Sequence, residues 1–155
     1  MKGRPERLIA RIICIGLFLA FVTWIAEGER PLPDAYADRL LALQGRGSSM
    51  DASFNCAAYI CFAHKTPYCD AGRMFVGACR GQAIVADYQD RRDIDQEQLQ
   101  PGDVASWHGV HVAAYLGDGR WIDSDSRRGH VATFRLSSKD GDPWFFGEVR
   151  ILRWN

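Results

Sequence analysis

From Pro101-Gly102 onward the chain consists of short apolar runs separated by Gly and Asp residues. Runs of this length with such punctuation predict strands rather than helices. Gly117-Asp-Gly119 is typical of a tight turn and predicts a hairpin between the runs on either side. The five predicted strands span residues 104–107, 111–116, 120–124, 130–134 and 146–154. We expect this half of the chain to form an antiparallel sheet.

The residues before this half show helical spacing of apolar side chains. Asp34 is a predicted cap for one helix, and Asp51 or Ser53 for a second helix that carries Cys56 and ends near His64. After a loop, a third helix is predicted over residues 82–88. Helices first and an antiparallel sheet afterwards indicate an α+β domain, with the helices packed on the sheet.

The N-terminal segment carries a membrane-targeting pattern. Four basic residues precede the uncharged apolar run 12–26: Lys2, Arg4, Arg7 and Arg11. This run predicts a transmembrane anchor whose N-terminus faces the cytoplasm. A cleaved signal peptide is the alternative, with Ala35-Tyr-Ala37 as the nearest small-residue site. Both place the domain outside the inner membrane.

Pro31 and Pro33 predict a short stiff spacer after the apolar run. We therefore divide the chain into an anchor or signal segment, residues 1–30, and one folded domain, residues 31–155. A length of 155 residues leaves room for little else. The formal net charge is zero and the charges are interspersed beyond the N-terminus, so no basic surface for nucleic acid is expected.

One cysteine and one histidine have the sequence setting that thiol chemistry requires. Cys56 lies in the first turn of a predicted helix, where the helix dipole favours the thiolate. His111 opens a predicted strand, on the same face as Ala113 and Tyr115. The small alanine side chains of this strand would let the helix pack closely and bring Cys56 to the imidazole. Across the hairpin, Asp123 is expected to accept the Nδ1 proton of His111.

The other residues with reactive side chains have alternative explanations. Asp125 is the second candidate for the role of Asp123. Cys69 and Cys79 can pair in an oxidising compartment, whereas Cys56 and Cys61 lie too close within one helix for a good disulfide. His108 and His111 have the spacing of a metal pair. Because no acidic or thiol ligand set accompanies these histidines, we expect no metal site and no cofactor.

The order and spacing of these motifs resemble the NlpC/P60 family of cysteine peptidases. The resemblance is carried by three segments, residues 55–59, 101–103 and 111–117, within roughly residues 50–130. The position of the family's third polar residue is occupied by Asp123. The resemblance implies a papain-like core, with Cys56 as nucleophile, His111 as proton shuttle and Asp123 as the group that orients His111.

The same resemblance places Asn55, Ala57 and Tyr59 at the substrate. The family usually has Asp and Ser beside the cysteine, so Asn55 and Ala57 remove a charge and a hydroxyl there. We expect weaker recognition of a free amine, and a different scissile bond or a cross-linked substrate becomes plausible. The CHAP amidases are the nearest rival family, since the segment 110–113 matches their strand motif in part.

The resemblance implies a hydrolase that cleaves amide bonds in peptidoglycan stem peptides through an acyl-enzyme. Its partners would be these peptides and, through the N-terminal segment, the inner membrane. This substrate lies in the compartment that the N-terminus independently predicts. The alternative is a non-catalytic module on the same scaffold, which binds peptidoglycan or a protein partner in an envelope complex.

Overall fold

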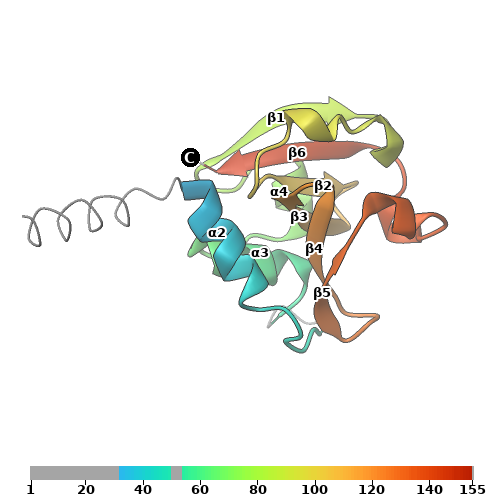
Figure 1. Ribbon diagram of the computed structural model, residues 1–155. Coiled ribbons are helices and arrows are strands. Elements are labelled where there is room, and N and C mark those ends of the chain that lie inside the picture. The colour runs from blue at the N-terminus through green and yellow to red at the C-terminus, as the bar shows by residue number, and fades with distance from the viewer. Residues whose placement is uncertain (1–31, 50–53, 155) are drawn as a thin grey trace, which may run out of the picture. The chain divides into compact units, whose positions relative to one another are not determined.

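The computed structural model describes residues 32–49 and 54–154 (Figure 1). The helices are α2 (Leu32–Leu41), α3 (Cys56–His64) and α4 (Ala71–Phe75). The strands are β1 (Gln82–Tyr88), β2 (Val104–Trp107), β3 (His111–Gly117), β4 (Arg120–Asp125), β5 (His130–Phe134) and β6 (Val149–Trp154). Four short 3-10 helices are η1 (Arg91–Asp93), η2 (Gln96–Gln98), η3 (Leu136–Lys139) and η4 (Pro143–Phe145).

The six strands form one sheet in the order β1-β6-β2-β3-β4-β5. Every neighbouring pair is antiparallel, and β3 and β4 form the hairpin predicted at Gly117-Asp-Gly119. The α+β class and the five sheet strands expected from the second half of the chain are confirmed. Only the start of β6 differs appreciably, because residues 143–145 form η4 and pairing begins at Val149.

The helix predicted over residues 82–88 is wrong, because this segment is strand β1. β1 lies at the edge of the sheet and pairs only with β6, more than sixty residues later in the chain. Several of its side chains are exposed, including the β-branched Ile84 and Val85. A half-exposed edge strand has weak alternation, so the distant partner decides its conformation.

α2 begins earlier than the sequence predicted. It starts at Leu32, so Pro33 and Asp34 lie within its first turn rather than before it. Proline is tolerated there because the amide groups of a first turn have no partner inside the helix. The predicted spacer is therefore in part the beginning of the folded domain.

Each face of the sheet is covered by a separate hydrophobic core. α2, α3 and α4 pack on one face, against side chains that include Val112, Ala114 and Ile122. The segment between β5 and β6 covers the opposite face with Leu136 and Phe145 (Figure 1). β2 and β3 are therefore buried on both sides. Because both faces of the sheet are covered, the start of β3, where the candidate site lies, is held between two cores.

A stack of three aromatic rings joins α2, α3 and β6. His64, the last residue of α3, lies between Tyr36 and Trp154, with ring centroids 3.6 Å and 4.3 Å away. Burial, followed by the charge of Arg39, lowers the pKa of His64 to about 3. The imidazole is therefore neutral at physiological pH, and the stack fixes the C-terminal end of α3 on the sheet.

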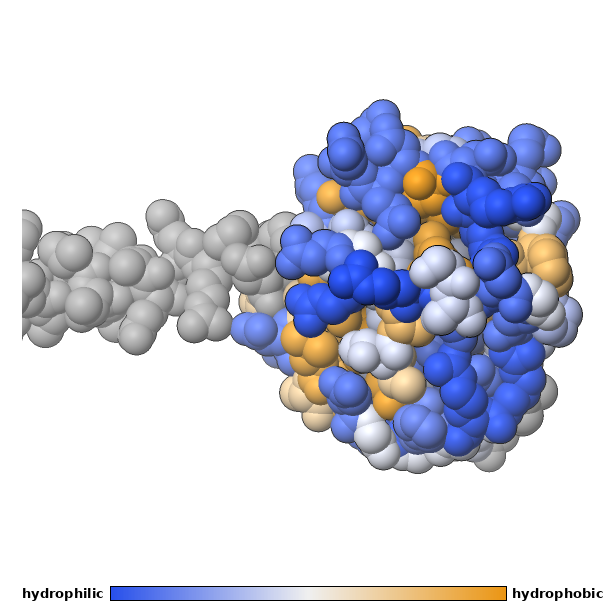
Figure 2. Space-filling model, turned by 45° about the vertical axis from the view of Figure 1, so that its right-hand side comes forward, coloured by the Kyte–Doolittle hydropathy of each residue, from blue (hydrophilic) through white to orange (hydrophobic). Residues whose placement is uncertain are grey.

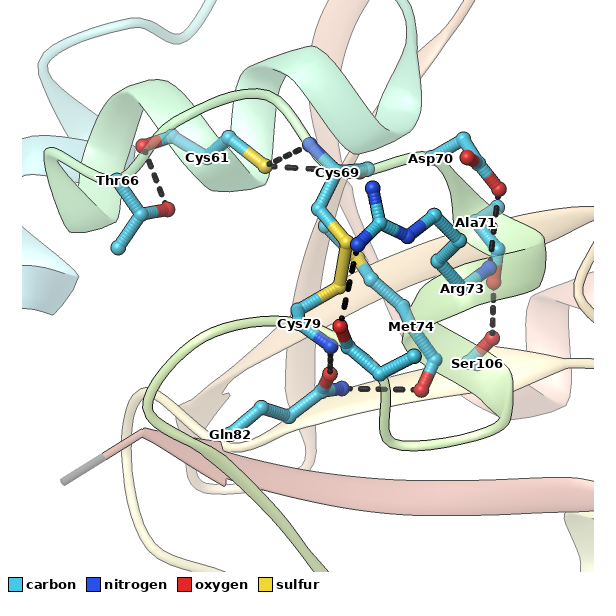
Figure 3. Close-up of a disulfide and its surroundings, with 11 residues drawn as sticks. Cys61, Thr66, Cys69, Asp70, Ala71, Arg73, Met74, Cys79, Gln82 and Ser106 are labelled. Carbon is cyan, nitrogen blue, oxygen red and sulfur yellow. Dashed lines mark hydrogen bonds between the residues drawn. A yellow bond between two sulfur atoms is a disulfide. The ribbon is translucent and has the colours of Figure 1, made fainter.

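A disulfide fixes the loop beside α3. Cys69, just before α4, pairs with Cys79, just before β1, as Figure 3 shows. The pairing expected in an oxidising compartment is thus present. Cys61 stays free and buried, and its sulfur accepts a hydrogen bond from the N–H of Cys69 at 3.2 Å. The loop is therefore held both to the segment before β1 and to α3.

Most of the face drawn in Figure 2 is hydrophilic, and hydrophobic residues gather there in a few patches. Among the described residues, the large hydrophobic side chains left exposed include Phe62, Val76, Val110 and Phe146. No helix within residues 32–49 and 54–154 is long and apolar enough to cross a membrane. The predicted anchor or signal segment, residues 1–30, lies outside the described residues.

We predict that replacing both Cys69 and Cys79 by serine lowers the free energy of unfolding by about 3 kcal/mol, because the open chain regains loop entropy. Urea denaturation with and without reductant measures the change. Cys61→Ser is the matched control, since it removes a thiol that is not in the disulfide. Equal stability of the oxidised and reduced protein would contradict the prediction.

Candidate active site

Cys56 is the first residue of α3, and Asn55 determines that start. Asn55 has extended backbone geometry, and its Oδ1 accepts a hydrogen bond from the N–H of Ala58 at 2.9 Å. The predicted caps, Asp51 and Ser53, lie outside the described residues, and the cap is Asn55. The position of Cys56 in the first turn agrees with the sequence prediction. The N-terminal dipole of α3 therefore acts on the half-buried thiol.

His111 begins β3 and is fully buried. Its ring packs among three aromatic side chains. The ring centroids of Trp144, Phe145 and Trp107 lie at 4.8 Å, 5.0 Å and 6.4 Å from that of His111. These rings exclude water and restrict the imidazole to one orientation.

The packing predicted around His111 is wrong in one respect. Ala113 and Tyr115 belong to the core on the face opposite α3, whereas Val112 and Ala114 face the helices. Because β3 is buried on both sides, its apolar pattern does not identify the helix-facing side. Cys56 reaches His111 because the N-terminus of α3 lies against the start of β3, with the Cys56 sulfur also bonded to the backbone of Val112.

The Cys56 thiol lies beside the His111 imidazole, close enough for each group to shift the pKa of the other. Burial raises the pKa of Cys56, but the hydrogen bond and charge of His111 outweigh burial and lower it overall. Burial alone would lower the pKa of His111, yet its hydrogen bonds to Asp123 and Cys56 raise it to about 9. Both shifts favour a thiolate–imidazolium pair at neutral pH.

Asp123 completes a row of three side chains. Its Oδ2 lies 3.0 Å from Nε2 of His111, and both residues are fully buried. The predicted bond to Nδ1 is wrong. Ala114 pairs with Ile122, so the next residue of β4, Asp123, lies opposite Ala113. Ala113 is two residues from His111. Over this distance Nε2, the ring nitrogen farther from the backbone, is the one that reaches Asp123. Nδ1 has no hydrogen-bond partner among the described residues, so it is the nitrogen left free for the thiol.

Asp125, the second candidate for this role, is turned toward two arginines. Its oxygens accept hydrogen bonds from Arg127 at 2.9 Å and 3.2 Å and from Arg128 at 2.8 Å. Burial opposes ionisation, but these bonds hold the pKa of Asp125 well below its usual value. The structure places Asp123, and not Asp125, on His111.

The Cys56 sulfur opens into a cleft of about 260 Å³. Asn55 and Ala57, two of the predicted substrate-binding residues, line this cleft. Tyr59 does not: it is fully buried, and its hydroxyl donates to the carbonyl of Leu40 at 2.9 Å. Tyr59 lies nearly one turn further into α3 than Cys56, and its side chain is part of the core.

No protein-family profile and no curated protein sequence matches the chain. Solved structures do match. NlpC1 from Trichomonas vaginalis is 17% identical over 76% of this chain and 43% of its own, with a TM-score of 0.54. An NlpC/P60 family protein from Bacillus cereus is 21% identical over 77% and 40%, with a TM-score of 0.55. NlpC2 from Trichomonas vaginalis is 19% identical over 79% and 47%, with a TM-score of 0.51.

The chain has the NlpC/P60 fold. It spans less than half the length of each of these three proteins. At this level of identity the likeness extends to the fold alone.

Most residues that line the cleft were not predicted from the sequence. The further lining residues are Tyr68, Asp70, Ala71, Gly72, Gly109, Val110, Ser124, Ser126 and Trp144. Gly72 lies in α4 and Gly109 in the turn between β2 and β3, and a Cβ on Gly109 would lie only 2.9 Å from the Cα of Gly72. The positive φ of Gly109 is the one local requirement behind this approach, and the sequence alone does not reveal it.

The two closely spaced histidines serve different partners within this NlpC/P60 fold. Nε2 of His108 accepts a hydrogen bond from the N–H of Glu148 at 3.1 Å, while His111 faces Cys56 and Asp123. Across the described ranges, no group of three or more His, Cys, Asp or Glu side chains has the geometry of a metal site. The geometry of His111 instead suits proton transfer to and from a thiol.

We predict that iodoacetamide modifies Cys56 with a pH midpoint below that of free cysteine, because His111 lowers the pKa of this thiol. At any given pH, the thiolate fraction of Cys56 is then larger than that of free cysteine. Peptide mapping by mass spectrometry against pH measures the midpoint. Cys61 is the internal control, since burial raises the pKa of its thiol. His111→Ala should move the Cys56 midpoint upward, and a midpoint at or above that of free cysteine in the unaltered protein would contradict the assignment.

Proposed function

We propose that this protein is a cell-wall hydrolase that cleaves amide bonds in peptidoglycan stem peptides through a cysteine nucleophile. The observation that carries the proposal is the buried row of Cys56, His111 and Asp123, which ends at an open cleft. The NlpC/P60 fold and the motif resemblance support the same reaction class.

In the proposed acylation, the Cys56 thiolate attacks the carbonyl carbon of the scissile amide. The resulting tetrahedral intermediate collapses as its C–N bond breaks, and the His111 imidazolium gives its proton to the leaving amine. Asp123, bonded to Nε2, keeps the proton to be transferred on the side of the ring that faces the thiol. The products of this step are a thioester at Cys56, a free amine and a neutral imidazole.

In the proposed deacylation, His111 acts as a base. The neutral imidazole takes a proton from a water molecule as the oxygen of that water attacks the thioester carbonyl. Collapse of the second tetrahedral intermediate breaks the C–S bond and releases the carboxylic acid. The thiolate–imidazolium pair is then restored, so no cofactor is consumed.

Asp70 is the residue that we propose orients a cationic group of the substrate. It is the only carboxylate among the residues that line the cleft. Its Oδ1 caps α4 by accepting from the N–H of Arg73 at 2.9 Å, which leaves Oδ2 for a ligand. Asn55 and Ala57 give neither charge nor hydroxyl to the wall beside Cys56, so Asp70 replaces the carboxylate expected there.

We further propose that residues 31–155 act as one catalytic domain on the extracytoplasmic side of the inner membrane. The segment of residues 1–30 would be an anchor or a cleaved signal, with an envelope-complex protein as a further partner. The Cys69–Cys79 disulfide supports an oxidising compartment. The apolar run after a basic N-terminus supports the same location.

We predict that Cys56→Ala reduces hydrolysis of purified muropeptides by about 10⁴-fold or more, because it removes the nucleophile. Mass spectrometry of the products measures the rate and identifies the bond. Cys61→Ser is the control, and unfolding curves establish that both variants are folded. Binding of muropeptides without turnover by the unaltered protein would instead favour the non-catalytic module.

We predict that Asp70→Asn raises KM by about fivefold for muropeptides with a free amine, because an exposed ion pair contributes up to about 1 kcal/mol. Asparagine caps helices as well as aspartate does, so α4 should be preserved. Asp95→Asn is the matched control, since Asp95 caps η2 and does not line the cleft. The effect should vanish on N-acetylated muropeptides. An equal rise for both substrates would refute the role of Asp70.

A further inference from the structure

Lys139 is a buried lysine on the far side of Asp123 from His111. It is the last residue of η3, and only 5% of its side chain is exposed. Its Nζ lies 3.7 Å from Oδ2 of Asp123 and 3.9 Å from Oδ2 of Asp142. Lysine is rarely buried to this extent without a charged partner. The nearer of these two partners is the carboxylate that also holds His111.

Aromatic rings surround the ammonium group of Lys139. Nζ lies 4.3 Å from the ring centroid of Phe134 and 4.5 Å from that of Phe145. Phe145 also packs on the ring of His111. Burial lowers the pKa of Lys139, and the charge of Asp123 opposes this effect. The ammonium group is therefore held in place beside the candidate site and is shielded from solvent.

One carboxylate oxygen makes a hydrogen bond to the imidazole and two longer ion pairs. Oδ2 of Asp123 lies 3.0 Å from Nε2 of His111, 3.6 Å from Nη2 of Arg128 and 3.7 Å from Nζ of Lys139. Oδ1 of the same carboxylate has no hydrogen bond to any described residue. Asp123 is thus not a carboxylate dedicated to His111, because the Arg128 guanidinium and the Lys139 amino group lie near the same oxygen.

The charges around Asp123 form a balanced framework. Ion pairs connect Arg127 to Asp125 and Asp142, and Arg128 to Asp125 and Asp123. With Lys139, the framework contains three carboxylates and three permanent cations, so its formal charge is zero. The thiolate–imidazolium pair adds one charge of each sign. Removal of Lys139 would leave one uncompensated negative charge beside His111.

This balance matters because His111 has to hold a proton and then release it. A buried carboxylate with no other partner stabilises an adjacent imidazolium strongly. A proton held too strongly is transferred slowly to the leaving amine, because transfer is most efficient when the pKa of the donor is near the working pH. A second cation on the same carboxylate weakens its attraction for that proton.

We propose that Lys139 is a positioning residue for the cysteine–histidine pair: its buried ammonium group lies beside the Asp123 carboxylate and limits how strongly that carboxylate retains the proton on His111. The effect of Lys139 on catalysis rests on the proposed hydrolase function. The electrostatic role itself is independent of any substrate.

The test is an NMR titration of the His111 imidazole in the full-length chain, with His111→Gln used to assign its resonances. Three variants are compared: Lys139→Met, which removes the charge, Lys139→Arg, which retains it, and Arg127→Gln, a matched loss of charge whose ion pairs do not include Asp123. We expect Lys139→Met to raise the His111 pKa by about 0.5–1 unit. Lys139→Arg should restore the original value, and Arg127→Gln should produce a smaller shift.

The basic limb of the pH profile for muropeptide hydrolysis should move upward with Lys139→Met by the same amount. An unchanged His111 pKa in a folded but less stable Lys139→Met variant would overturn the proposal and leave Lys139 a purely structural role. If Lys139→Met does not fold, Lys139→Gln provides the same loss of charge. The titration needs no substrate, so a shifted pKa without hydrolysis would refute the proposed function alone.

Discussion

The contact between the N-terminus of α3 and the start of β3 is the interaction on which the candidate site depends. It joins a thiol in a helix dipole to a fully buried imidazole. Aromatic rings pack around His111, and Cys61 of α3 is hydrogen-bonded to Cys69 of the disulfide. The site is thus a consequence of how a helix is seated at the end of a doubly covered sheet.

Electrostatics in this region follow from burial as much as from proximity. Cys56, His111 and Asp123 lie where the dielectric screening of water is weak, so each charge strongly affects the next. The outer ion pairs of Asp125 and Asp142 with arginines then keep the whole region close to neutral. Without these ion pairs, the carboxylate of Asp123 would bring an uncompensated negative charge into the core. The surrounding cations explain how the fold accommodates it.

Much of the fold could be predicted because local patterns agree with it. Gly and Asp at the turns delimit β2 to β5, and the contact between Cys56 and His111 follows from a helix start and a strand start. β1 could not be predicted, since its conformation depends on a partner at the other end of the domain. Which side of β3 faces α3 could not be predicted either, because a strand buried on both faces has no polar side that marks the solvent.

The direction in which individual side chains point could not be predicted from the spacing of residues in the sequence. Which nitrogen of His111 meets Asp123 depends on strand register and ring reach, and whether Tyr59 faces the cleft depends on the direction of side chains along α3. Asp70 caps α4 and Trp144 lies in η4, so their places at the cleft depend on how these two short elements pack. These residues carry no motif that would mark them in advance.

β6 lies between β1 and β2, although it follows all the other strands in the sequence. β1 therefore has no neighbour in the sheet until residues 149–154 are in place. Contacts between residues this far apart are entropically costly to form and slow the folding of a domain. Closure of the sheet consequently comes late. A newly made chain has to remain protected from aggregation, with the unpaired edges of β1 and β2 open, until its last strand is inserted.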